Sequence, residues 1–344
     1  MKFEDILEIK NGRNQRAVEN PRGKYPIYGS GGIMGYADDY ICDAYTVIIG
    51  RKGNINNPIF VEEPFWNVDT AFGLSANTDV ILPRFLYYFC KKFDFERLNK
   101  TVTIPSLTKS DLLKIEIEPP NLLQQRDIVE RLTKIERIIA LRKLELKLLD
   151  ELIRARFVEM FGDIRYEEKY QGIPLRRLCT TISGGTPSTK CSEYYEGNIP
   201  WISTVSLGPN YIDGSTAKGY ITQEAIDNSA TKLIPAGNIL FGTRVGVGKS
   251  SINDVALCIN QDIVAIVGID KNRFNVLFIK YVLDTYQSYY DSIKKGATIL
   301  GITGDDLKNT LIPVPSLELQ NQFADFVKVV DKSKFTKTFR PLRC

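Results

Sequence analysis

Two stretches of the sequence come close to phosphate-binding motifs. Residues 242–250 resemble a P-loop, the Gly-rich turn that holds nucleotide phosphates, but the two defining glycines lie one residue too far apart and no helix is expected after them. Residues 29–35 approach the GxGxxG pattern of dinucleotide sites, with Met34 in place of the third glycine. Both runs follow short β-type segments, and we interpret both as turns.

Composition restricts the possible chemistry further. Residues 57–60 resemble the Asn-Pro-Pro-aromatic motif with which amino-methyltransferases grip a target base, but Ile59 replaces the second proline and no Gly-rich cofactor motif accompanies it. We interpret this run as a turn as well. The 344 residues include no histidine, which excludes Ser-His-Asp and Cys-His nucleophiles and His-ligated zinc. The six cysteines are scattered without a Cys-x-x-Cys pair and predict buried free thiols in a reducing cytosol.

The charge balance permits a nucleic-acid partner without requiring one. The chain has 45 basic and 41 acidic residues, a net charge of +4, and local patches matter more than this sum. The sequence has neither a signal peptide nor an apolar run of about 20 residues, the length of a membrane span. We therefore expect a cytoplasmic protein with no metal and no cofactor of its own.

Two mixed domains are expected to position the turns. Residues 1–120 alternate short β-type runs with Gly-rich turns and short helices, and residues 163–316 repeat this composition. A chain of this length is expected to form two or three domains. The predicted fold class is α/β (mixed α+β), with two globular domains separated by long helices.

The first of these helices is expected over residues 121–162. Residues 121–161 contain no Gly or Pro, and their apolar positions step by four and three as in a coiled-coil seam, interrupted at Arg142. At about 1.5 Å per residue the helix would reach about 60 Å. The seam consists of Ile128, Leu132, Ile135, Ile139, Leu146, Leu149 and Ile153. A second apolar stripe beside it consists of Leu141, Leu144, Leu148 and Leu152.

An internal repeat underlies this plan of domain, helix, domain, helix. The clearest match sets residues 107–128 against residues 302–323 with one constant separation. Weaker matches lie upstream, and the separation between their members varies, as loop insertions would cause. The matched pairs are Leu107 and Ile302, Thr108 and Thr303, Asp111 and Asp306, Leu112 and Leu307, Ile117 and Ile312, Pro120 and Pro315, Leu122 and Leu317, Gln125 and Gln320, and Ile128 and Phe323.

The duplicated pattern resembles the DNA specificity subunit of type I restriction-modification systems. Two variable domains, each followed by Pro-x-Leu-x-x-Gln-x-x-apolar and a helix, carry the resemblance, at Pro120 to Ile128 and at Pro315 to Phe323. The Gly184-Gly185-Thr186-Pro187 opening of the second domain adds to it. The resemblance covers nearly the whole chain.

The resemblance implies a division of labour. Each globular domain would be a target recognition domain that reads one half of a bipartite, asymmetric DNA sequence, and the antiparallel helices would fix the unread spacer. Separate methyltransferase subunits, usually two, would bring S-adenosylmethionine and methylate adenine. Separate restriction subunits, which are motors driven by ATP with magnesium, would cleave. This chain itself would catalyse nothing.

DNA contact would then use basic, amide and hydroxyl side chains on the turns. Arg and Lys bond guanine, Asn and Gln bond adenine, and all of them can hold phosphate. The alternative for each residue is a solvated turn position. The candidates are Arg13, Asn14, Arg51, Lys52 and Asn54 in the first domain, and Thr186, Ser188, Lys190, Arg244, Lys249, Lys294 and Lys295 in the second.

The second helix is expected to be shorter than the first. Its seam restarts at Phe323, Val327 and Val330, but Lys334 occupies the next step and Pro341 forbids continuation, so we expect a helix over residues 317–336 and a basic non-helical tail over 337–344. The seam from Ile128 to Ile139 would then lack its partner. We expect a methyltransferase subunit or a second copy of the chain to cover it.

Two other functions remain open from the sequence. A self-sufficient DNA methyltransferase or nuclease fragment would need cofactor or metal motifs that the sequence does not show. A coiled-coil scaffold without DNA binding would leave the two variable domains unexplained, and salt-dependent binding to duplex DNA would exclude it.

Overall fold

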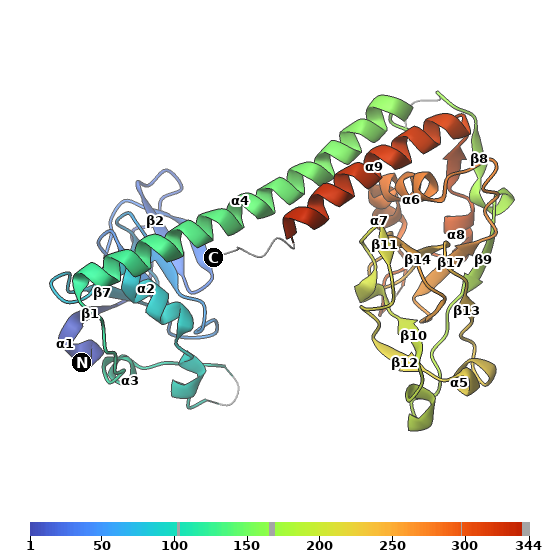
Figure 1. Cartoon of the computed structure of the whole chain (residues 1–344). Helices are drawn as coiled ribbons and strands as arrows, with labels where there is room; N and C mark the ends of the chain where they lie inside the picture. Colours follow the sequence, from blue (N-terminus) through green and yellow to red (C-terminus); the bar gives the residue numbers. More distant parts are fainter. Residues whose placement is uncertain (102–103, 165–168, 297, 339–344) are drawn as a thin grey trace. The chain divides into compact units, whose positions relative to one another are not determined.

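The computed structural model describes residues 1–101, 104–164, 169–296 and 298–338, and the side chains of these except 335–338. The chain divides into two compact units, Met1–Lys143 and Leu144–Cys344. Both units mix short helices with β-sheets, as the sequence predicts (Figure 1). Within the described parts of the chain, no helix combines the length and the apolar character needed to cross a membrane.

The first unit has two small sheets, and α2 packs against the four-stranded one. One sheet has the strand order β1-β7-β4-β5 with antiparallel neighbours, and the other has the order β3-β2-β6 with β2 and β6 parallel. Buried side chains of α1, β1, β4, β7 and α2 form its main core. The elements are α1 (Phe3–Ile6), β1 (Leu7–Asn11), β2 (Tyr25–Gly29), β3 (Gly32–Ala37), β4 (Thr46–Gly50), β5 (Ile59–Val61), β6 (Trp66–Asn67), β7 (Ala71–Ala76), α2 (Pro83–Lys92), the 3-10 turn Phe95–Leu98 and α3 (Lys109–Leu113).

The second unit repeats this topology. Its larger sheet contains the order β9-β17-β14-β15, and its second sheet contains β12-β10-β16 with β10 and β16 parallel. The predicted internal repeat is therefore confirmed strand by strand. Its strands are β8 (Gly172–Pro174), β9 (Thr180–Ser183), β10 (Ile199–Ile202), β11 (Tyr211–Ile212), β12 (Gly219–Ile221), β13 (Leu233–Ile234), β14 (Ile239–Gly242), β15 (Ser250–Asn253), β16 (Leu257–Ile259), β17 (Ile263–Val267) and β18 (Leu311–Pro313). Its helices are α5 (Gln223–Asp227), α6 (Val276–Thr285), α7 (Gln287–Ile293), α8 (Gly304–Lys308) and α9 (Leu317–Thr338), with 3-10 turns at Leu175–Arg177, Ser192–Tyr195 and Thr204–Ser206.

The long helix is α4, which runs without a break over Leu122–Phe161 and has 40 residues. It begins in the first unit and ends in the second. Its sequence lacks the residues that would break a helix, and at about 1.5 Å per residue it spans about 60 Å. The prediction of one long helix at this place is confirmed.

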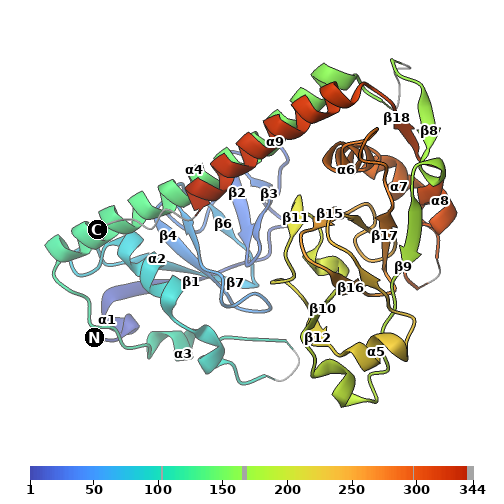
Figure 2. The same ribbon diagram turned by 45° about the vertical axis from the view of Figure 1, so that its right-hand side comes forward.

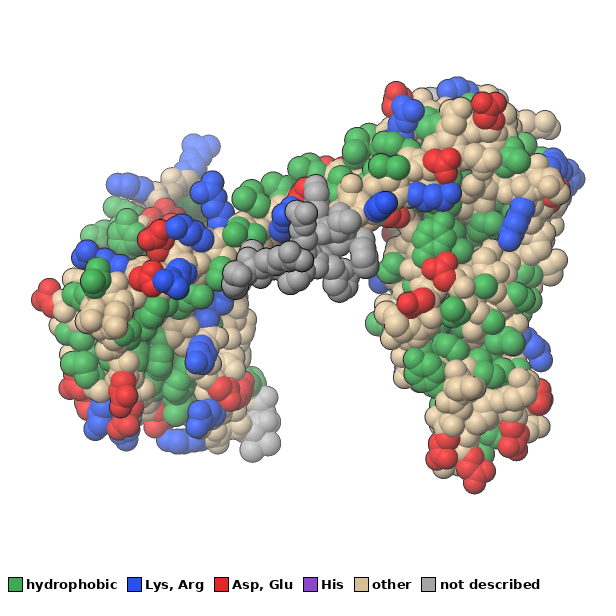
Figure 3. Space-filling model, viewed as in Figure 1, with side chains coloured by type: hydrophobic (Ala, Val, Ile, Leu, Met, Phe, Trp, Pro, Cys, Tyr) green, Lys and Arg blue, Asp and Glu red, His purple; other side chains and the backbone are tan. Residues whose placement is uncertain are grey.

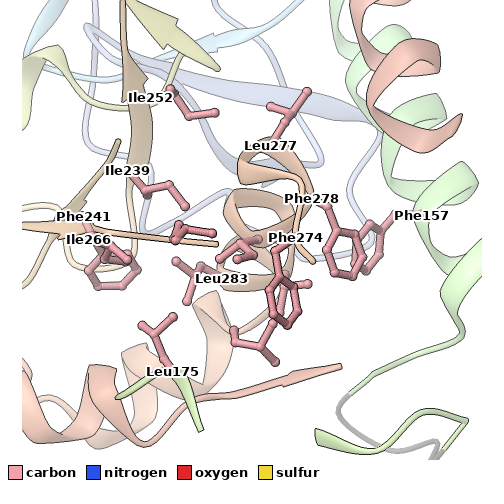
Figure 4. Packing of buried hydrophobic residues seen from close by; sticks show 14 of the residues in the cluster. Phe157, Leu175, Ile239, Phe241, Ile252, Ile266, Phe274, Leu277, Phe278 and Leu283 are labelled. Atoms are coloured by element: carbon pink, nitrogen blue, oxygen red, sulfur yellow. The ribbon is translucent and has the colours of Figure 1, made fainter. Parts of the chain in front are cut away.

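The end of α4 is part of the core of the second unit. Phe157 and Phe161 of α4 contact Phe323 of α9, with ring centroids 5.3 and 5.7 Å apart, and Phe157 lies 6.0 Å from Phe278 of α6. Figure 4 shows the rings of Phe157 and Phe278 side by side in this cluster, and Figures 1 and 2 both show α9 alongside the end of α4. Burial of these rings fixes α4 and α9 to α6.

The second helix, α9, has 22 residues against the 40 of α4. It extends through Lys337 and Thr338, so these two residues are helical and not the start of a non-helical tail as the sequence suggested. Helix ends assigned by different criteria commonly differ by one or two residues. The rest of the expected tail, residues 339–344, lies outside the described residues.

The predicted seam on α4 changes character along the helix. Ile153 is buried together with Phe323, Val327 and Val330, and Leu149 packs against the same cluster. Ile128, Leu132 and Leu146 are half-buried. Ile135 and Ile139 are 45% and 49% exposed. The second stripe of Leu141, Leu144, Leu148 and Leu152 is also exposed.

A buried glutamine joins each long helix to its own unit. Gln125 accepts a hydrogen bond from the Leu82 amide at 2.8 Å and donates to the carbonyls of Val80 and Pro120 at 2.9 and 2.8 Å. Both glutamines are fully buried.

Gln320 makes the same three bonds in the second unit, from the Asn275 amide at 2.8 Å and to the carbonyls of Arg273 and Pro315 at 3.1 and 3.0 Å. The glutamine of the repeated Pro-x-Leu-x-x-Gln pattern therefore locks the start of α4 to the start of α2, and the start of α9 to the start of α6.

A carboxylate on α4 makes a second contact with α2. Glu136 accepts a hydrogen bond from the Tyr88 hydroxyl at 2.8 Å, and its carboxylate lies 3.3 Å from the Lys91 ammonium and 3.4 Å from the Arg84 guanidinium. Burial opposes ionisation of Glu136, but the bonds from Tyr88 and Lys91 outweigh it, so the pKa of this carboxyl is lowered.

Replacement of Glu136 by Gln should lower the free energy of unfolding of the first unit at pH 7 by less than about 1 kcal/mol, because the group is partly exposed. A carboxyl with a lowered pKa stabilises the folded state above its unfolded pKa of about 4.3 and loses this effect as the pH falls. The difference between variant and parent in urea unfolding should therefore be smaller at pH 3.5 than at pH 7. Glu130→Gln, at an exposed ion pair with Lys134, is the control, and an equal loss at both pH values would contradict the prediction.

Candidate nucleic-acid interface

A tight turn between β6 and β7 is the centre of a loop cluster in the first unit. The Ala71 amide donates to the Val68 carbonyl at 3.0 Å and closes the turn. The flanking loops attach to the same turn, because the Arg13 amide donates to the Asn67 carbonyl at 2.8 Å and the Arg51 amide to the Thr70 carbonyl at 2.7 Å. Backbone bonds, which do not depend on side-chain identity, therefore hold three loops together.

The second unit builds the same cluster with different residues. The Ile263 amide closes the turn on the Asn260 carbonyl at 3.1 Å, the Gly185 amide donates to the Ile259 carbonyl at 2.9 Å, and the Thr243 amide donates to the Asp262 carbonyl at 2.8 Å. A further loop joins in both units, since the amides of Leu107 and Ile302 donate to the carbonyls of Arg51 and Thr243 at 2.9 and 2.8 Å. We call this shared set of backbone bonds the loop skeleton.

Two tryptophans complete the loop skeleton from different strands. The indole of Trp66 in β6 donates to the Arg13 carbonyl at 3.0 Å, and the indole of Trp201 in β10 donates to the Gly185 carbonyl at 3.1 Å. Arg13 and Gly185 occupy the same place in the skeleton. The carbonyl at this place therefore accepts a tryptophan indole in both units. The tryptophan comes from β6 in the first unit and from β10, which does not correspond to β6, in the second.

Glycines are required where two backbones meet in the skeleton. A Cβ on Gly12 would lie 1.8 Å from the Val68 carbonyl oxygen, and a Cβ on Gly184 would lie 2.1 Å from the Asn260 carbonyl oxygen. No side chain fits at either place. The Gly184-Gly185 pair noted in the sequence thus serves the close approach of β9 to the turn after β16.

Four of the candidate residues of the first unit lie on the loops that the skeleton joins. Arg13, Arg51 and Lys52 are exposed, and their backbone amides all bond the stretch from Asn67 to Thr70. Asn54 lies in the same turn as Arg51, because its carbonyl oxygen abuts Gly50. Asn14 is exposed next to Arg13 and caps its own loop by accepting from the Arg16 amide at 2.9 Å.

The candidates of the second unit fall into different surroundings. The exposed Thr186 bonds Gln261, and the Arg244 guanidinium lies 3.9 Å from Asp262. Lys295 pairs with Gly301, directly before Ile302 of the skeleton. Thr186, Arg244 and Lys295 therefore surround the turn after β16.

The other four candidates of the second unit make different contacts. Lys294 forms an ion pair with Asp291. Lys249 lines a cavity of about 570 Å³ between the end of α4 and α6. Ser188 and Lys190 are exposed on the loop that follows β9.

Sequence reasoning missed Gln261. It is exposed at the tip of the turn between β16 and β17, and its side chain bonds Thr186. The available signal was the polar Asn260-Gln261-Asp262 run between two apolar strands. Asp69 holds the same position in the first unit and is likewise exposed.

Two of the three motif-like stretches are connections between strands, as interpreted, whereas the interpretation of residues 57–60 as a turn is wrong for Ile59 and Phe60, which lie in β5. Residues 242–250 connect the antiparallel strands β14 and β15, whereas a P-loop connects a strand to a helix. Residues 29–35 lie in the β2–β3 hairpin, and residues 57–58 lead into β5. Among the described cysteines, Cys179 and Cys191 are only partly buried, contrary to the expectation that all are buried. Burial still raises the pKa of Cys179 to about 11.

Each unit has a surface region where exposed charges of one sign gather. In Figure 3 acidic side chains gather at the end of the second unit that carries α5. Exposed acidic residues there are Glu193, Glu196, Glu224 and Asp227. The loop before β2 in the first unit instead carries exposed basic residues, which are Arg13, Arg16, Arg22 and Lys24. Phosphate groups are attracted to the basic loop and repelled by the acidic end.

A family match covers most of the chain. The type I restriction modification DNA specificity domain matches residues 1–151 and again residues 167–339. The type I restriction enzyme MjaIX specificity subunit of Methanocaldococcus jannaschii is 33% identical over 158 residues, and the EcoR124I/EcoR124II specificity subunit of Escherichia coli is 35% identical over 159 residues. These matches cover 46% and 43% of this chain and 37% of each relative.

Other similarities extend over the whole chain. A putative type I restriction enzyme specificity subunit of Haemophilus influenzae is 25% identical over 346 residues, which are 96% of this chain and 86% of that one. The crystal structure of a type I restriction-modification S subunit from M. genitalium superposes with a TM-score of 0.63 at 17% identity, over 98% of this chain and 90% of that chain. The latter similarity concerns the fold.

Proposed function

The chain belongs to the type I restriction modification DNA specificity family, and we propose that it is the DNA-recognition subunit of a type I restriction-modification enzyme. Each unit reads one half of a bipartite, asymmetric target. The observation that carries this proposal is the loop skeleton, which occurs twice with the same backbone bonds and with different exposed side chains. A pair of identical supports with different side chains is suited to reading two different half-sites.

The proposed DNA contacts are the exposed polar residues on and beside the loop skeleton. Arginine guanidinium groups can bond guanine in the major groove or hold phosphate. Arg51 is exposed, and its guanidinium lies 5.8 Å from the ring centroid of the buried Phe72. Contacts in the first unit come from Arg13, Asn14, Arg51, Lys52 and Asn54, and in the second from Thr186, Ser188, Lys190, Arg244, Lys249, Lys294 and Lys295.

Catalysis belongs to partner subunits in this proposal. Two methyltransferase subunits bring S-adenosylmethionine, restriction subunits bring ATP and magnesium for translocation and cleavage, and the complex acts in the cytoplasm. The long helices set the spacer between the half-sites and dock the methyltransferases. Support for docking comes from the exposed leucines and isoleucines of α4, since contiguous exposed apolar side chains are typical of interaction sites.

Binding of duplex DNA by the chain together with its methyltransferase subunits tests the proposal. We expect Arg51→Ala to weaken binding by about 1–3 kcal/mol if Arg51 reads a base, or to lower the slope of log affinity against log salt by about 1 if it holds a phosphate. Arg97→Ala, at an exposed arginine of the same unit, should leave affinity and slope unchanged. Binding that does not depend on salt would contradict the proposal.

Methyl transfer separates the proposal from the enzyme alternative. The chain and labelled S-adenosylmethionine should methylate no DNA unless the methyltransferase subunits are added. Methylation by the purified chain alone would overturn the assignment as a recognition subunit.

A further inference from the structure

The tip of the skeleton turn is an exposed position on a backbone that several hydrogen bonds hold in each unit. In the first unit the four carbonyls of Asn67, Val68, Thr70 and Ala71 all accept backbone amides. Four of these amides come from the flanking loops, those of Gly12, Arg13, Arg51 and Lys52. Asp69 is the residue of this turn whose side chain is exposed. A side chain on such a support has little backbone freedom left to lose on binding.

The equivalent turn of the second unit has the same support. The carbonyls of Ile259, Asn260, Asp262 and Ile263 accept backbone amides in the same pattern, and Gln261 is the exposed residue at the tip. Its side chain is further held by the bond to Thr186, which belongs to the adjoining loop. The two tips thus differ in chemistry, a carboxylate against an amide, on one shared geometry.

Basic residues lie on the loops that bond the skeleton turn. The tip of Asp69 is bonded through its turn to the backbones of Arg13 and Arg51. A carboxylate among phosphate-binding cations repels the DNA backbone unless it meets a donor on a base. Cytosine N4 is the major-groove donor that Asp accepts from, and adenine N6 and N7 are the pair that Gln binds.

We propose that the residue at the tip of the skeleton turn is a base-reading position in each unit, with Asp69 accepting from a cytosine in one half-site and Gln261 bonding an adenine in the other. The inference rests on the proposed function, because it requires that the two units bind separate half-sites. The surrounding basic residues then hold phosphates and fix the register of each tip.

Isosteric exchanges at the two tips test the proposal. The chain is co-expressed with its methyltransferase subunits, and methylated adenines are mapped in the genomic DNA of the cells. Asp69→Asn should relax or change one base pair of one half-site, with discrimination at that base pair lowered about tenfold to hundredfold. Gln261→Glu should do the same in the other half-site only.

Matched controls are exposed residues of the same type in the same units. Asp79→Asn and Gln171→Glu should leave the methylated motif unchanged. Thermal unfolding should give parental midpoints for both tip variants, because neither side chain is buried.

The possible failures can be told apart. A parental chain that directs methylation to a bipartite motif, with both tip variants leaving that motif unchanged, would overturn the base-reading role while the proposed function stands. A parental chain that directs no bipartite motif would overturn the proposed function itself.

Discussion

Phe323→Ala should lower the free energy of unfolding of the second unit by about 3–5 kcal/mol, the usual cost of removing a buried ring. The ring of Phe323 is fully buried and lies 5.3 Å from Phe157, 5.7 Å from Phe161 and 5.1 Å from Tyr281. Its loss leaves a cavity at the point where α4, α6 and α9 meet. Urea unfolding followed by circular dichroism measures the change.

A control for this change lies on the same helix. Val329 is 67% exposed on α9, and Val329→Ala should change the free energy of unfolding by less than about 0.5 kcal/mol. A loss below about 1 kcal/mol for Phe323→Ala would contradict the packing described above. Loss of the cooperative transition of the second unit would agree with it.

Gln320→Glu should destabilise the second unit by about 2–3 kcal/mol at pH 8. The exchange keeps the shape of the side chain but replaces its NH₂ group, so the buried carbonyls of Arg273 and Pro315 lose their donor and face a carboxylate. Gln125→Glu should have the same effect in the first unit, where Val80 and Pro120 supply the carbonyls.

The loss should depend on pH in a defined direction. Burial against two carbonyls raises the pKa of the introduced carboxyl above the unfolded value of about 4.3. The folded state then binds more protons than the unfolded state between these two pKa values, so stability falls as the pH rises through this window. Unfolding at pH 5 should therefore show a smaller loss than unfolding at pH 8.

The neighbouring glutamine provides a matched control. Gln124 is exposed and its side-chain oxygen accepts from the Asn121 amide. A carboxylate can accept the same bond at a helix start, so Gln124→Glu should be neutral at both pH values. Equal losses for Gln124→Glu and Gln125→Glu would show that the buried bonds of Gln125 are not what distinguishes the two positions.

The repeat was predictable from sequence where side chains carry it. Thr108 and Thr303 cap short helices by accepting from the Asp111 and Asp306 amides, both at 3.1 Å, and these residues match at one constant separation. The long helix was predictable for a similar reason, because a run without Gly or Pro and with a regular apolar step leaves few alternatives.

The loop skeleton could not be predicted from the sequence. Its bonds join backbone groups, which leave no signature in residue types beyond the glycines at close approaches. The Trp66 and Trp201 indoles satisfy equivalent carbonyls from different strands, so an alignment of the two halves places each tryptophan opposite an unrelated residue. The polar run from Asn260 to Asp262 indicated a turn at Gln261, but only the folded turn shows that Gln261 matches Asp69.

The candidate contact residues stay predictions. Sequence reasoning chose Arg51 and Lys52 because they follow a Gly-ended strand, and the structure brings both to the skeleton turn. It chose Lys294 as a basic residue expected on a loop of the second domain, and this residue forms an ion pair with Asp291. A charged residue in a predicted turn is a good indication that its side chain is exposed. It is a poor indication of which residues lie close together in space, because that depends on pairing between strands that are distant in the sequence.

The loop skeleton has a consequence for how such a chain can change over generations. Main-chain groups fix the turn and its flanking loops, so substitutions at the tip need not rebuild the fold, provided that the glycines at the close approaches persist. If the tip reads a base as proposed, such substitutions change the recognised sequence. Each unit has its own skeleton and its own buried glutamine lock. Under the proposed function, one half of the recognised sequence could therefore diverge while the other is inherited unchanged.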